Sequence, residues 1–479
     1  MSELNHKIVK ATKWSTITEI IAKLITPITS IVLARLLTPE AFGVVTTLTM
    51  IISFAEIFTD AGFQKYLIQH EFVDDLDKER STNVAFWSNL VMSLLIWLII
   101  GIFASPLATV VGNPGLGHVL TISCISIPLA AFSSIQMALY KRELDFKTLF
   151  KVRIVAICIP LVVTVPLAFY MRSYWALVIG TVVSNFVNAI LLTWYSKWKP
   201  KLYYSFAKLK QMFSFSAWSV VEAVTIWMTS YVDVFIIGIY LNEYYLGLYK
   251  TSITLVGQIM GLITAATTPI LFSSLSRLQN DDEEFQKMFF KFQKFVGLLV
   301  IPLGVGIYCY SDLVAMIFGE QWLPASHFIG LWGLTSAITV VLSHYSSEVY
   351  RSKGKPRISV LSQFLHLIVL CPAILIAVKY GFEALYTTRA FVRLEGVLVN
   401  LLLMHFIFHI SAWKMFYNIR YPVLGSVLMV GTSCFLNSFC QSMFWQCLSA
   451  FICIAIYFAF LFIIPSERKI YFSLLHKIK

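Results

Sequence analysis

The sequence predicts an all-α polytopic membrane protein, and three observations support this fold class. Of the 479 residues, 58% are hydrophobic and 13% are charged, whereas a soluble domain carries about 25% charged residues. The mean hydropathy is +0.77. Apolar runs of about 20 residues recur along the whole chain, and each is long enough to cross the hydrocarbon core as a helix. The connections between these runs are too short to form a soluble domain.

Fourteen apolar runs are expected to be transmembrane helices. They lie at residues 14–36, 41–62, 84–106, 118–140, 152–170, 174–195, 213–240, 245–272, 289–310, 325–349, 358–379, 383–409, 421–440 and 444–464. The first and the twelfth run give the weakest signals, because each contains several charged side chains.

Lysine and arginine gather in alternate connections, as at residues 141–153, 197–210 and 351–357, and both chain ends are also basic. Since basic loops stay on the cytoplasmic side, both termini are expected to be cytoplasmic. The alternation continues to the last run, which supports the number fourteen. The net charge of +12 is mostly this bias, so a nucleic-acid partner is not expected.

A charged, turn-forming corner, LARLLTPEAFG at residues 33–43, separates the first two runs. Arg35 and Glu40 are expected at the membrane rim. Pro39 is expected to stop one helix, and Gly43 to let the next helix pack closely. These four residues are structural candidates rather than ligands.

The same corner returns 204 residues later as IYLNEYYLG, where Gly247 aligns with Gly43. Six helices per half insert the same way up, so the halves are expected to be parallel bundles. The predicted parts are a six-helix lobe at 1–196, a cytoplasmic interfacial linker at 197–212, a second six-helix lobe at 213–411, and helices 13 and 14 with a basic tail at 412–479.

Three segments mix aromatic and basic residues in the pattern of amphipathic helices that lie at the headgroup level. They are residues 203–215, 413–421 and 470–479.

Charges on the first two spans are costly in a bilayer and usually face a cavity or one another. Glu19 and Lys23 are four residues apart, so they share a helix face and can pair. Lys23 lies near mid-membrane and is a candidate for lining a substrate cavity. Glu56 and Asp60 have the same spacing. Asp60 is expected to cap a turn, and Glu56 could instead meet Lys23.

The seventh and eighth spans carry a second group. Glu222 and Asp233 are three turns apart on one face of the seventh span, and Lys250 opens the eighth. Lys250 is either a cavity residue or the partner of Asp233. Glu19, Glu222 or Asp233 could bind a proton or Na⁺, or each could neutralise a nearby base.

Arg389 and Arg393 are four residues apart on the twelfth span, and Arg393 lies near the midplane. Two guanidiniums on one face suit a diphosphate, because each can bind oxygens in bidentate fashion. The alternative is an internal salt bridge to Asp233 or Glu348. Glu395 lies on another face and is expected to balance a different helix.

No motif indicates an enzyme, a cofactor or a metal site. Walker, HExxH and GxSxG sequences are absent, and none of the eight cysteines forms a CxxC pair. His405 and His409 have metal-ligand spacing but no evident third ligand. An ATP-driven pump in a single chain and a glycosyltransferase with an aqueous domain are both excluded.

The corner LARLLTPEAFG, followed by FTDAGFQKYLIQ at 58–69, resembles the polysaccharide transport family of lipid-linked oligosaccharide flippases. This family belongs to the multidrug/oligosaccharidyl-lipid/polysaccharide exporter superfamily. VDVFIIG at 232–238, LFSSLSRLQND at 271–281 and FGEQWLPA at 318–325 extend the resemblance over roughly residues 10 to 330. Asp233 matches the family's motif position, whereas the arginine pair is not carried over from the family.

The resemblance implies a secondary transporter that works by alternating access in the bacterial inner membrane. Its implied cargo is an oligosaccharide repeat unit on undecaprenyl (polyprenyl) diphosphate, used for O-antigen, capsule or exopolysaccharide. A polysaccharide polymerase and glycosyltransferases would then be its partners.

Four alternatives remain. A drug or cation antiporter of the same superfamily would favour a net acidic cavity, and a lipid II flippase has less similar corner motifs. A major facilitator would carry a basic loop after its second span, where this chain has HEFVDDLDKERS. A non-transporting scaffold for glycan assembly is the fourth.

Overall fold

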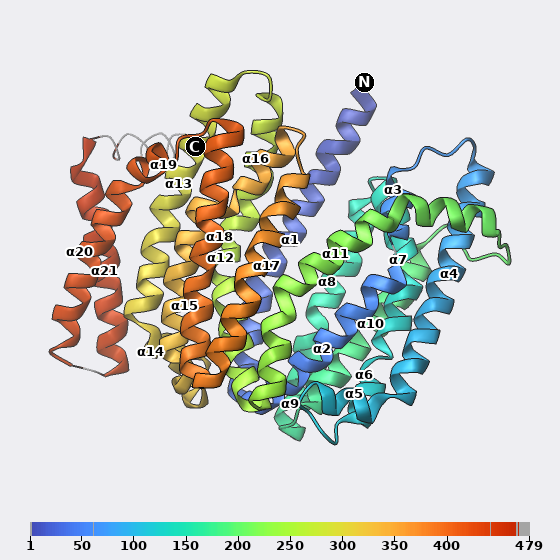
Figure 1. Ribbon diagram of the computed structural model, residues 1–479, viewed down its shortest axis with the longest axis horizontal. Coiled ribbons are helices and arrows are strands. Elements are labelled where there is room, and N and C mark those ends of the chain that lie inside the picture. The colour runs from blue at the N-terminus through green and yellow to red at the C-terminus, as the bar shows by residue number, and fades with distance from the viewer. Residues whose placement is uncertain (1, 61, 441, 466–467, 469–479) are drawn as a thin grey trace. The chain divides into compact units, whose positions relative to one another are not determined.

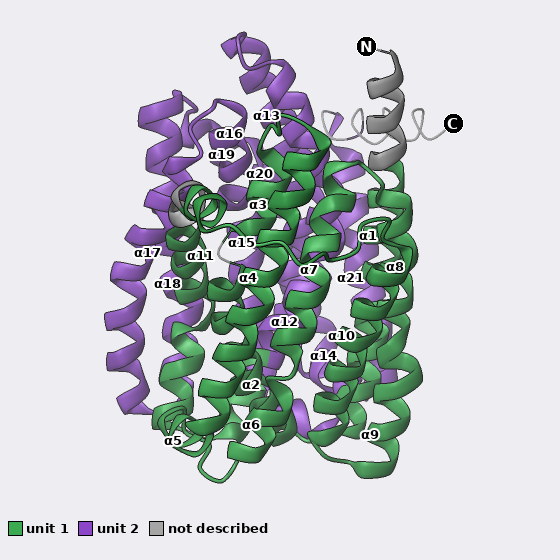
Figure 2. Cartoon of the chain, turned by 90° about the vertical axis from the view of Figure 1, so that its right-hand side faces the viewer, with its two compact units in different colours: residues 1–250 green, residues 251–479 purple. Residues whose placement is uncertain are grey.

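The computed structural model describes residues 2–60, 62–440, 442–465 and 468. Over this part of the chain the secondary structure is helical and contains no β-strand (Figure 1). The chain forms two compact units, residues 1–250 and 251–479 (Figure 2). The predicted all-α fold class is therefore confirmed.

Unit 1 contains the first eleven α-helices and the start of the twelfth. They are α1 (Ser2–Leu36), α2 (Pro39–Asp60), α3 (Phe63–Gln69), α4 (Asp75–Ile102), α5 (Ala104–Val110), α6 (Gly117–Ser123), α7 (Ser126–Arg142), α8 (Phe146–Ile159), the π-helical turn η1 (Pro160–Thr164), α9 (Val165–Met171), α10 (Trp175–Tyr195), α11 (Phe206–Tyr240) and α12 (Glu243–Arg277), which continues into unit 2.

Unit 2 contains the remaining elements. They are α13 (Asp282–Cys309), α14 (Ser311–Phe318), the 3₁₀ turn η2 (Glu320–Ala325), α15 (Ser326–Thr339), the π-helical turn η3 (Val340–His344), α16 (Ser346–Ser352), α17 (Arg357–Ala377), the 3₁₀ turn η4 (Val378–Tyr380), α18 (Phe382–Phe408), α19 (Ala412–Asn418), α20 (Arg420–Asn437) and α21 (Met443–Ile463).

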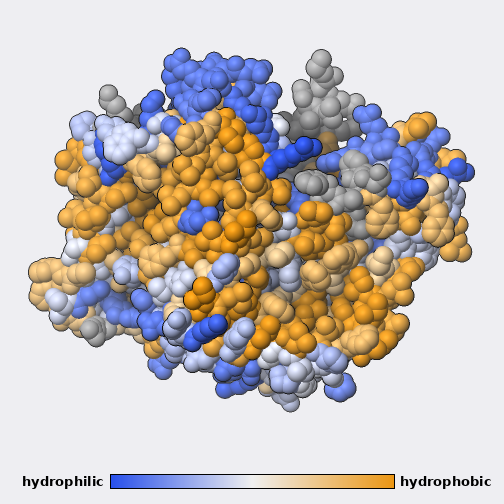
Figure 3. All heavy atoms as spheres, viewed as in Figure 1, coloured by the Kyte–Doolittle hydropathy of each residue, from blue (hydrophilic) through white to orange (hydrophobic). Residues whose placement is uncertain are grey.

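Thirteen stretches of helix within the described residues are long and apolar enough to cross a membrane. A fourteenth arises if α19 and α20, which meet at a 49° bend, form one broken span. Each of these stretches overlaps one of the fourteen predicted runs, in the same order. On the face shown in Figure 3 much of the surface is apolar, as expected for a surface in contact with lipid.

The first corner follows from its sequence. Helix α1 ends at Leu36, and α2 begins at Pro39. Proline disfavours helix at the residue before it and is well tolerated at a helix start, so the chain breaks at Thr38 and restarts at once. Pro39 therefore opens the second helix as well as ending the first.

Two glycines of the corners lie against backbone. A Cβ atom built on Gly43 would lie 1.8 Å from the carbonyl oxygen of Glu243. A Cβ built on Gly247 would lie 1.8 Å from the carbonyl oxygen of Pro39. Each glycine thus meets the residue that opens the other corner's helix, and any side chain at either position would force the two helices apart.

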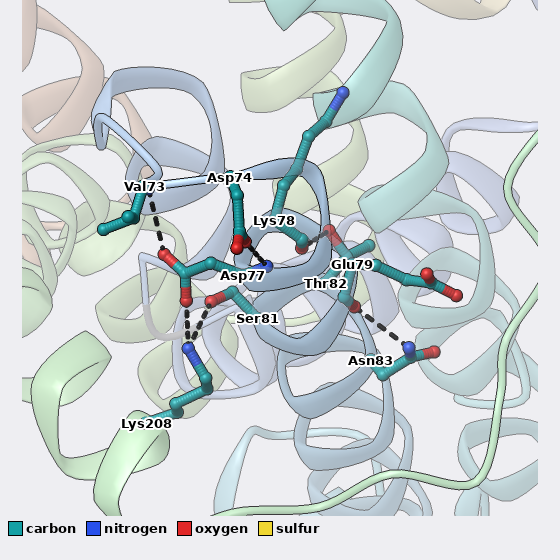
Figure 4. A network of polar contacts seen from close by, with 9 residues as sticks. All are labelled: Val73, Asp74, Asp77, Lys78, Glu79, Ser81, Thr82, Asn83 and Lys208. Atoms are coloured by element: carbon teal, nitrogen blue, oxygen red, sulfur yellow. Dashed lines mark hydrogen bonds and ion pairs between the residues drawn. The ribbon is translucent and has the colours of Figure 1, made fainter.

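The linker ahead of α11 is held by α4. The Asn83 side chain accepts a hydrogen bond from the Lys201 amide at 2.8 Å, and the Trp87 indole donates to the Lys201 carbonyl at 2.9 Å. Asp77 pairs with Lys208 at the start of α11 (Figure 4). These contacts give the linker a defined path along the end of α4.

The interfacial predictions have different outcomes. Residues 203–215 do not form a separate helix, because α11 runs from Phe206 into the span without a break. Residues 413–421 coincide with α19 and its bend. Residues 470–479 lie outside the described residues. The predicted lobes at 1–196 and 213–411, with the linker at 197–212 and the appendage at 412–479, stay a prediction, because the compact units instead divide after Lys250.

Candidate functional site

The two arginines of α18 share one aromatic surface. The guanidinium carbon of Arg393 lies 3.8 Å from the centroid of the Trp332 ring, and that of Arg389 lies 5.4 Å from it. Arg393 also donates a hydrogen bond to the Ser336 hydroxyl at 2.8 Å. Trp332 and Ser336 are four residues apart on α15, as are the arginines on α18, so one face of each helix meets the other.

This cluster is deeply placed. Arg389 is 8% exposed and Trp332 is 5% exposed. A guanidinium stacked on an indole is held by cation–π attraction. Its planar fork can bind phosphate oxygens in bidentate fashion, so the diphosphate role expected for this pair stays a prediction.

Glu348 and Glu395, the two acids considered beside this arginine pair in the sequence, have other partners. Glu348 pairs with Arg351, one turn along its own helix, at 3.0 Å. The alternative salt bridge from the arginine pair to Glu348 is not formed in the described part of the chain. Glu395 meets the Nδ1 atom of His366 on α17 at 2.9 Å, as its position on another face of α18 predicts.

A polar network that the sequence analysis missed is centred on Asn400 of α18. Its carbonyl accepts hydrogen bonds from the hydroxyls of Tyr350 at 2.8 Å and Ser362 at 3.1 Å. Its amide donates to the Ser343 hydroxyl and the Gly396 carbonyl, each at 2.9 Å. The signal available in the sequence was an asparagine inside an apolar run, where an unsatisfied amide is costly.

Asp233 is a buried acid of unit 1 with well-placed donors. It is 2% exposed, and its carboxylate accepts from the Tyr249 hydroxyl at 2.6 Å and from the Val234 amide at 2.8 Å. The neighbouring Lys250 donates to the Ser230 carbonyl at 3.3 Å, and its ammonium lies 4.6 Å from the Tyr231 ring centroid. A carboxylate held in this way is a candidate for binding a cation.

The other candidates on α2 and α11 lie near α3. Glu222 pairs with Lys65 of α3 at 3.1 Å, and both side chains are well exposed. Asp60 accepts a hydrogen bond from the Gln64 amide at 3.4 Å, which is the capping role predicted for it. Gly62 has φ +78°, which explains the glycine of this turn. Within the described residues, no hydrogen bond or ion pair is formed by the half-buried Glu56 carboxylate.

The remaining candidates lie on α1 and at the start of α2. Glu19 is exposed and Lys23 is half-buried, and no ion pair joins them in the part of α1 that the structure describes. Arg35 is exposed in the last turn of α1, and Glu40 lies in the first turn of α2, where an acid stabilises a helix N-terminus.

Among the described residues, no cluster of three or more His, Cys, Asp or Glu side chains has the arrangement needed for a metal ion. The eight cysteines are all free thiols.

The fold and these intramembrane charges define the class as a multi-pass helical membrane protein with transporter architecture. Residues 32–327 match the profile of the family described as "Polysaccharide biosynthesis protein". Because this match covers more than half of the chain, the protein belongs to that family, and the resemblance seen in its corner motifs is confirmed.

Individual relatives agree with this assignment. The chain is 21% identical to "Lipopolysaccharide biosynthesis protein WzxC" of Escherichia coli, over 84% of this chain and 81% of the relative. It is 25% identical to "Succinoglycan biosynthesis transport protein ExoT" of Rhizobium meliloti, over 73% of this chain and 69% of the relative. Its fold matches a solved lipid II flippase, MurJ, with a TM-score of 0.76, 15% identity, and coverage of 95% of this chain and 99% of that chain.

Proposed function

We propose that this protein is a flippase that moves oligosaccharide repeat units linked to undecaprenyl diphosphate across the bacterial inner membrane for surface polysaccharide synthesis. Membership of the polysaccharide biosynthesis family carries this proposal. One relative is named for lipopolysaccharide biosynthesis and another for succinoglycan biosynthesis and transport, so both names concern the synthesis of a polysaccharide and one of them names transport.

The chemistry of the site supports this cargo. Moving a diphosphate and its sugars through bare hydrocarbon would leave charges and hydroxyls unsolvated, which is prohibitive. Arg389 and Arg393 lie within the twelfth apolar run, and both guanidiniums are held against Trp332. They would replace water around the diphosphate, while the polyprenyl chain stays in the lipid.

The same observation weighs against a cation or drug antiporter. Such a protein would favour a net acidic cavity, whereas the α18 cluster carries two guanidiniums. Asp233 remains a candidate for coupling transport to a proton or Na⁺, since its carboxylate is buried and hydrogen-bonded rather than exposed.

The orientation of the chain belongs to the proposal as well. Both termini would lie in the cytoplasm, and the lysine- and arginine-rich alternate connections support this orientation. The glycosyltransferases that build the substrate would then act on the cytoplasmic face of the membrane, and the polymerase that consumes it would act on the opposite face.

The test uses a bacterial strain that lacks this protein and is complemented with wild type or with Arg389→Ala/Arg393→Ala. Surface polysaccharide and the leaflet location of lipid-linked repeat units are measured. The matched control is Arg357→Ala, which removes an exposed arginine of the same unit.

We expect the double variant, at normal protein level, to accumulate repeat units on the cytoplasmic side, and the control to behave as wild type. If repeat units accumulate only in the full deletion, the flippase function is supported, but the two arginines are not part of the substrate site. If the deletion itself accumulates no repeat units, the substrate class is wrong, and cation efflux becomes the next assay.

A further inference from the structure

An apolar groove of about 570 Å³ opens on the surface of unit 1. It runs along the outer face of α7, between α4 and α10, which pack on either side of that helix (Figure 2). Its floor includes Leu129 and Phe132 of α7. Its volume lies within the range of ligand pockets, roughly 300–1,000 Å³.

The α10 wall of the groove is a regular stripe. Phe186, Ile190 and Trp194 follow one another at four-residue spacing and are 52%, 44% and 79% exposed. From Phe186 to Trp194 the helix rises about 12 Å at about 1.5 Å per residue. One leaflet contributes about 15 Å of hydrocarbon, so the groove has the length of a single leaflet.

Lys199 joins this groove to a polar hollow. The same lysine lines the groove and a second hollow of about 450 Å³, which also contains Lys78, Lys197 and Lys201. Lys199 donates to the carbonyl of Thr193 near the end of α10, so its ammonium lies at the mouth of the groove.

The polar hollow is lined by more lysines than acidic residues. Lys78 pairs with Glu143 at 2.9 Å, and Lys201 pairs with Glu79 at 2.5 Å. The remaining charges are Lys197 and Lys199 against one exposed acid, Asp75. The polar hollow therefore carries a net positive charge directly beside the apolar groove.

We propose that these two hollows form one binding site for an anionic glycerophospholipid of the bilayer. The acyl chain lies in the groove along Phe186, Ile190 and Trp194, and the phosphate meets Lys197 and Lys199. An amphipathic tryptophan at the boundary between them is the usual anchor at the level of lipid headgroups. Lysines near the surface attract anionic lipids by about 1 kcal/mol each.

This site is separate from the arginines on α18 and does not depend on the proposed function. The groove spans one leaflet, whereas a polyprenyl chain is much longer than one acyl chain, so the dimensions favour a phospholipid over the tail of a transport substrate.

The test places the full-length protein in nanodiscs of phosphatidylcholine that contain a minor fraction of photoreactive phosphatidylglycerol, with the reactive group in the acyl chain. Crosslinked peptides are mapped by mass spectrometry. Three variants are compared with wild type: Lys197→Gln/Lys199→Gln removes the phosphate contacts, Ile190→Trp fills the groove, and Lys147→Gln/Lys210→Gln removes two other exposed lysines of unit 1 as a matched control.

In wild type and in the control we expect crosslinks within residues 186–199. In Lys197→Gln/Lys199→Gln we expect the apparent affinity for phosphatidylglycerol to fall about thirtyfold, which is about 1 kcal/mol for each lysine. Ile190→Trp should abolish the crosslink, while Ile99→Trp, on a lipid-exposed part of α4 outside the groove, should not.

Two results would overturn the proposal. Equal labelling by photoreactive phosphatidylcholine, unaffected by the lysine changes, would mean that the groove holds bulk lipid without selectivity. Stronger labelling by a photoreactive polyprenyl phosphate, which phosphatidylglycerol cannot displace, would assign the groove to a polyprenyl chain instead.

Discussion

The Arg393 guanidinium lies 3.8 Å from the centroid of the Trp332 ring, and it also donates to Ser336, one turn further along the tryptophan's helix. Stacking and this hydrogen bond together orient an arginine within the twelfth apolar run. A guanidinium is a planar fork that can bind two oxygens of an anion at once.

The first prediction concerns that stacking. Arg393→Lys should lower flipping of lipid-linked repeat units, because an ammonium stacks less well and cannot bind two oxygens at once. With the loss of about 1–2 kcal/mol of cation–π attraction, the rate should fall roughly five- to thirtyfold. Trp332→Phe should cost less than Trp332→Leu, because phenylalanine keeps an aromatic face. Equal losses in the two tryptophan variants, measured in proteoliposomes, would speak against the stacking.

The second prediction concerns the corner glycines. Gly43→Ala and Gly247→Ala each bring a methyl group against a backbone carbonyl, which cannot move aside without moving its helix. Overpacking of this kind costs about 1–3 kcal/mol, so the melting temperature in detergent should fall in both variants. Gly431→Ala is the control, since no atom lies within 4 Å of its added Cβ. A control that melts as early as the corner variants would refute the steric argument.

A third prediction tests the Asn400 network. Asn400→Leu removes the acceptor of two hydroxyls and leaves Tyr350 and Ser362 without this partner. The cost should be about 1–3 kcal/mol, the range for losing a partner of buried polar groups. The double variant Asn400→Leu/Ser362→Ala should recover part of this loss, because one unsatisfied hydroxyl is removed with its partner. Thermal unfolding of both variants measures the difference.

The fourth prediction concerns the linker on α4. Asn83→Ala removes the acceptor of the Lys201 amide, and the linker should open more often, so trypsin should cut after Lys197 or Lys201 several times faster. Glu79→Gln breaks only the exposed pair with Lys201, and exposed pairs contribute little to stability. Equal cleavage rates in Asn83→Ala and wild type would show that the linker is held by other contacts.

Much of the fold was predictable because each apolar run must satisfy its own backbone hydrogen bonds as a helix inside lipid. Hydropathy alone therefore located the spans. It could not show that residues 206–215 continue into α11, since a stretch of mixed aromatic and basic residues is amphipathic whether or not the helix goes on. Whether such a helix breaks depends on contacts with α3 and α4 that are distant in the sequence.

The site was less predictable for a similar reason. The i,i+4 spacing correctly placed Arg389 and Arg393 on one helix face, but their common neighbour Trp332 lies on another helix, far away in the chain. Glu348 shows the opposite case. Its partner Arg351 is three residues away on the same helix. Helical spacing alone therefore predicts this pair, whereas the sequence-based prediction considered only a partner on another helix.

The reciprocal contacts of the corner glycines have a consequence for the history of the chain. Pro39 and Glu243 are equivalent positions 204 residues apart, as are Gly43 and Gly247. Gly43 meets the carbonyl of Glu243, and Gly247 meets the carbonyl of the equivalent residue, Pro39. Surfaces related in this way form an isologous interface, the kind that joins two identical subunits. A half-length ancestor that carried one such corner would already have had the means to dimerise, and gene duplication with fusion would then have made that dimer permanent.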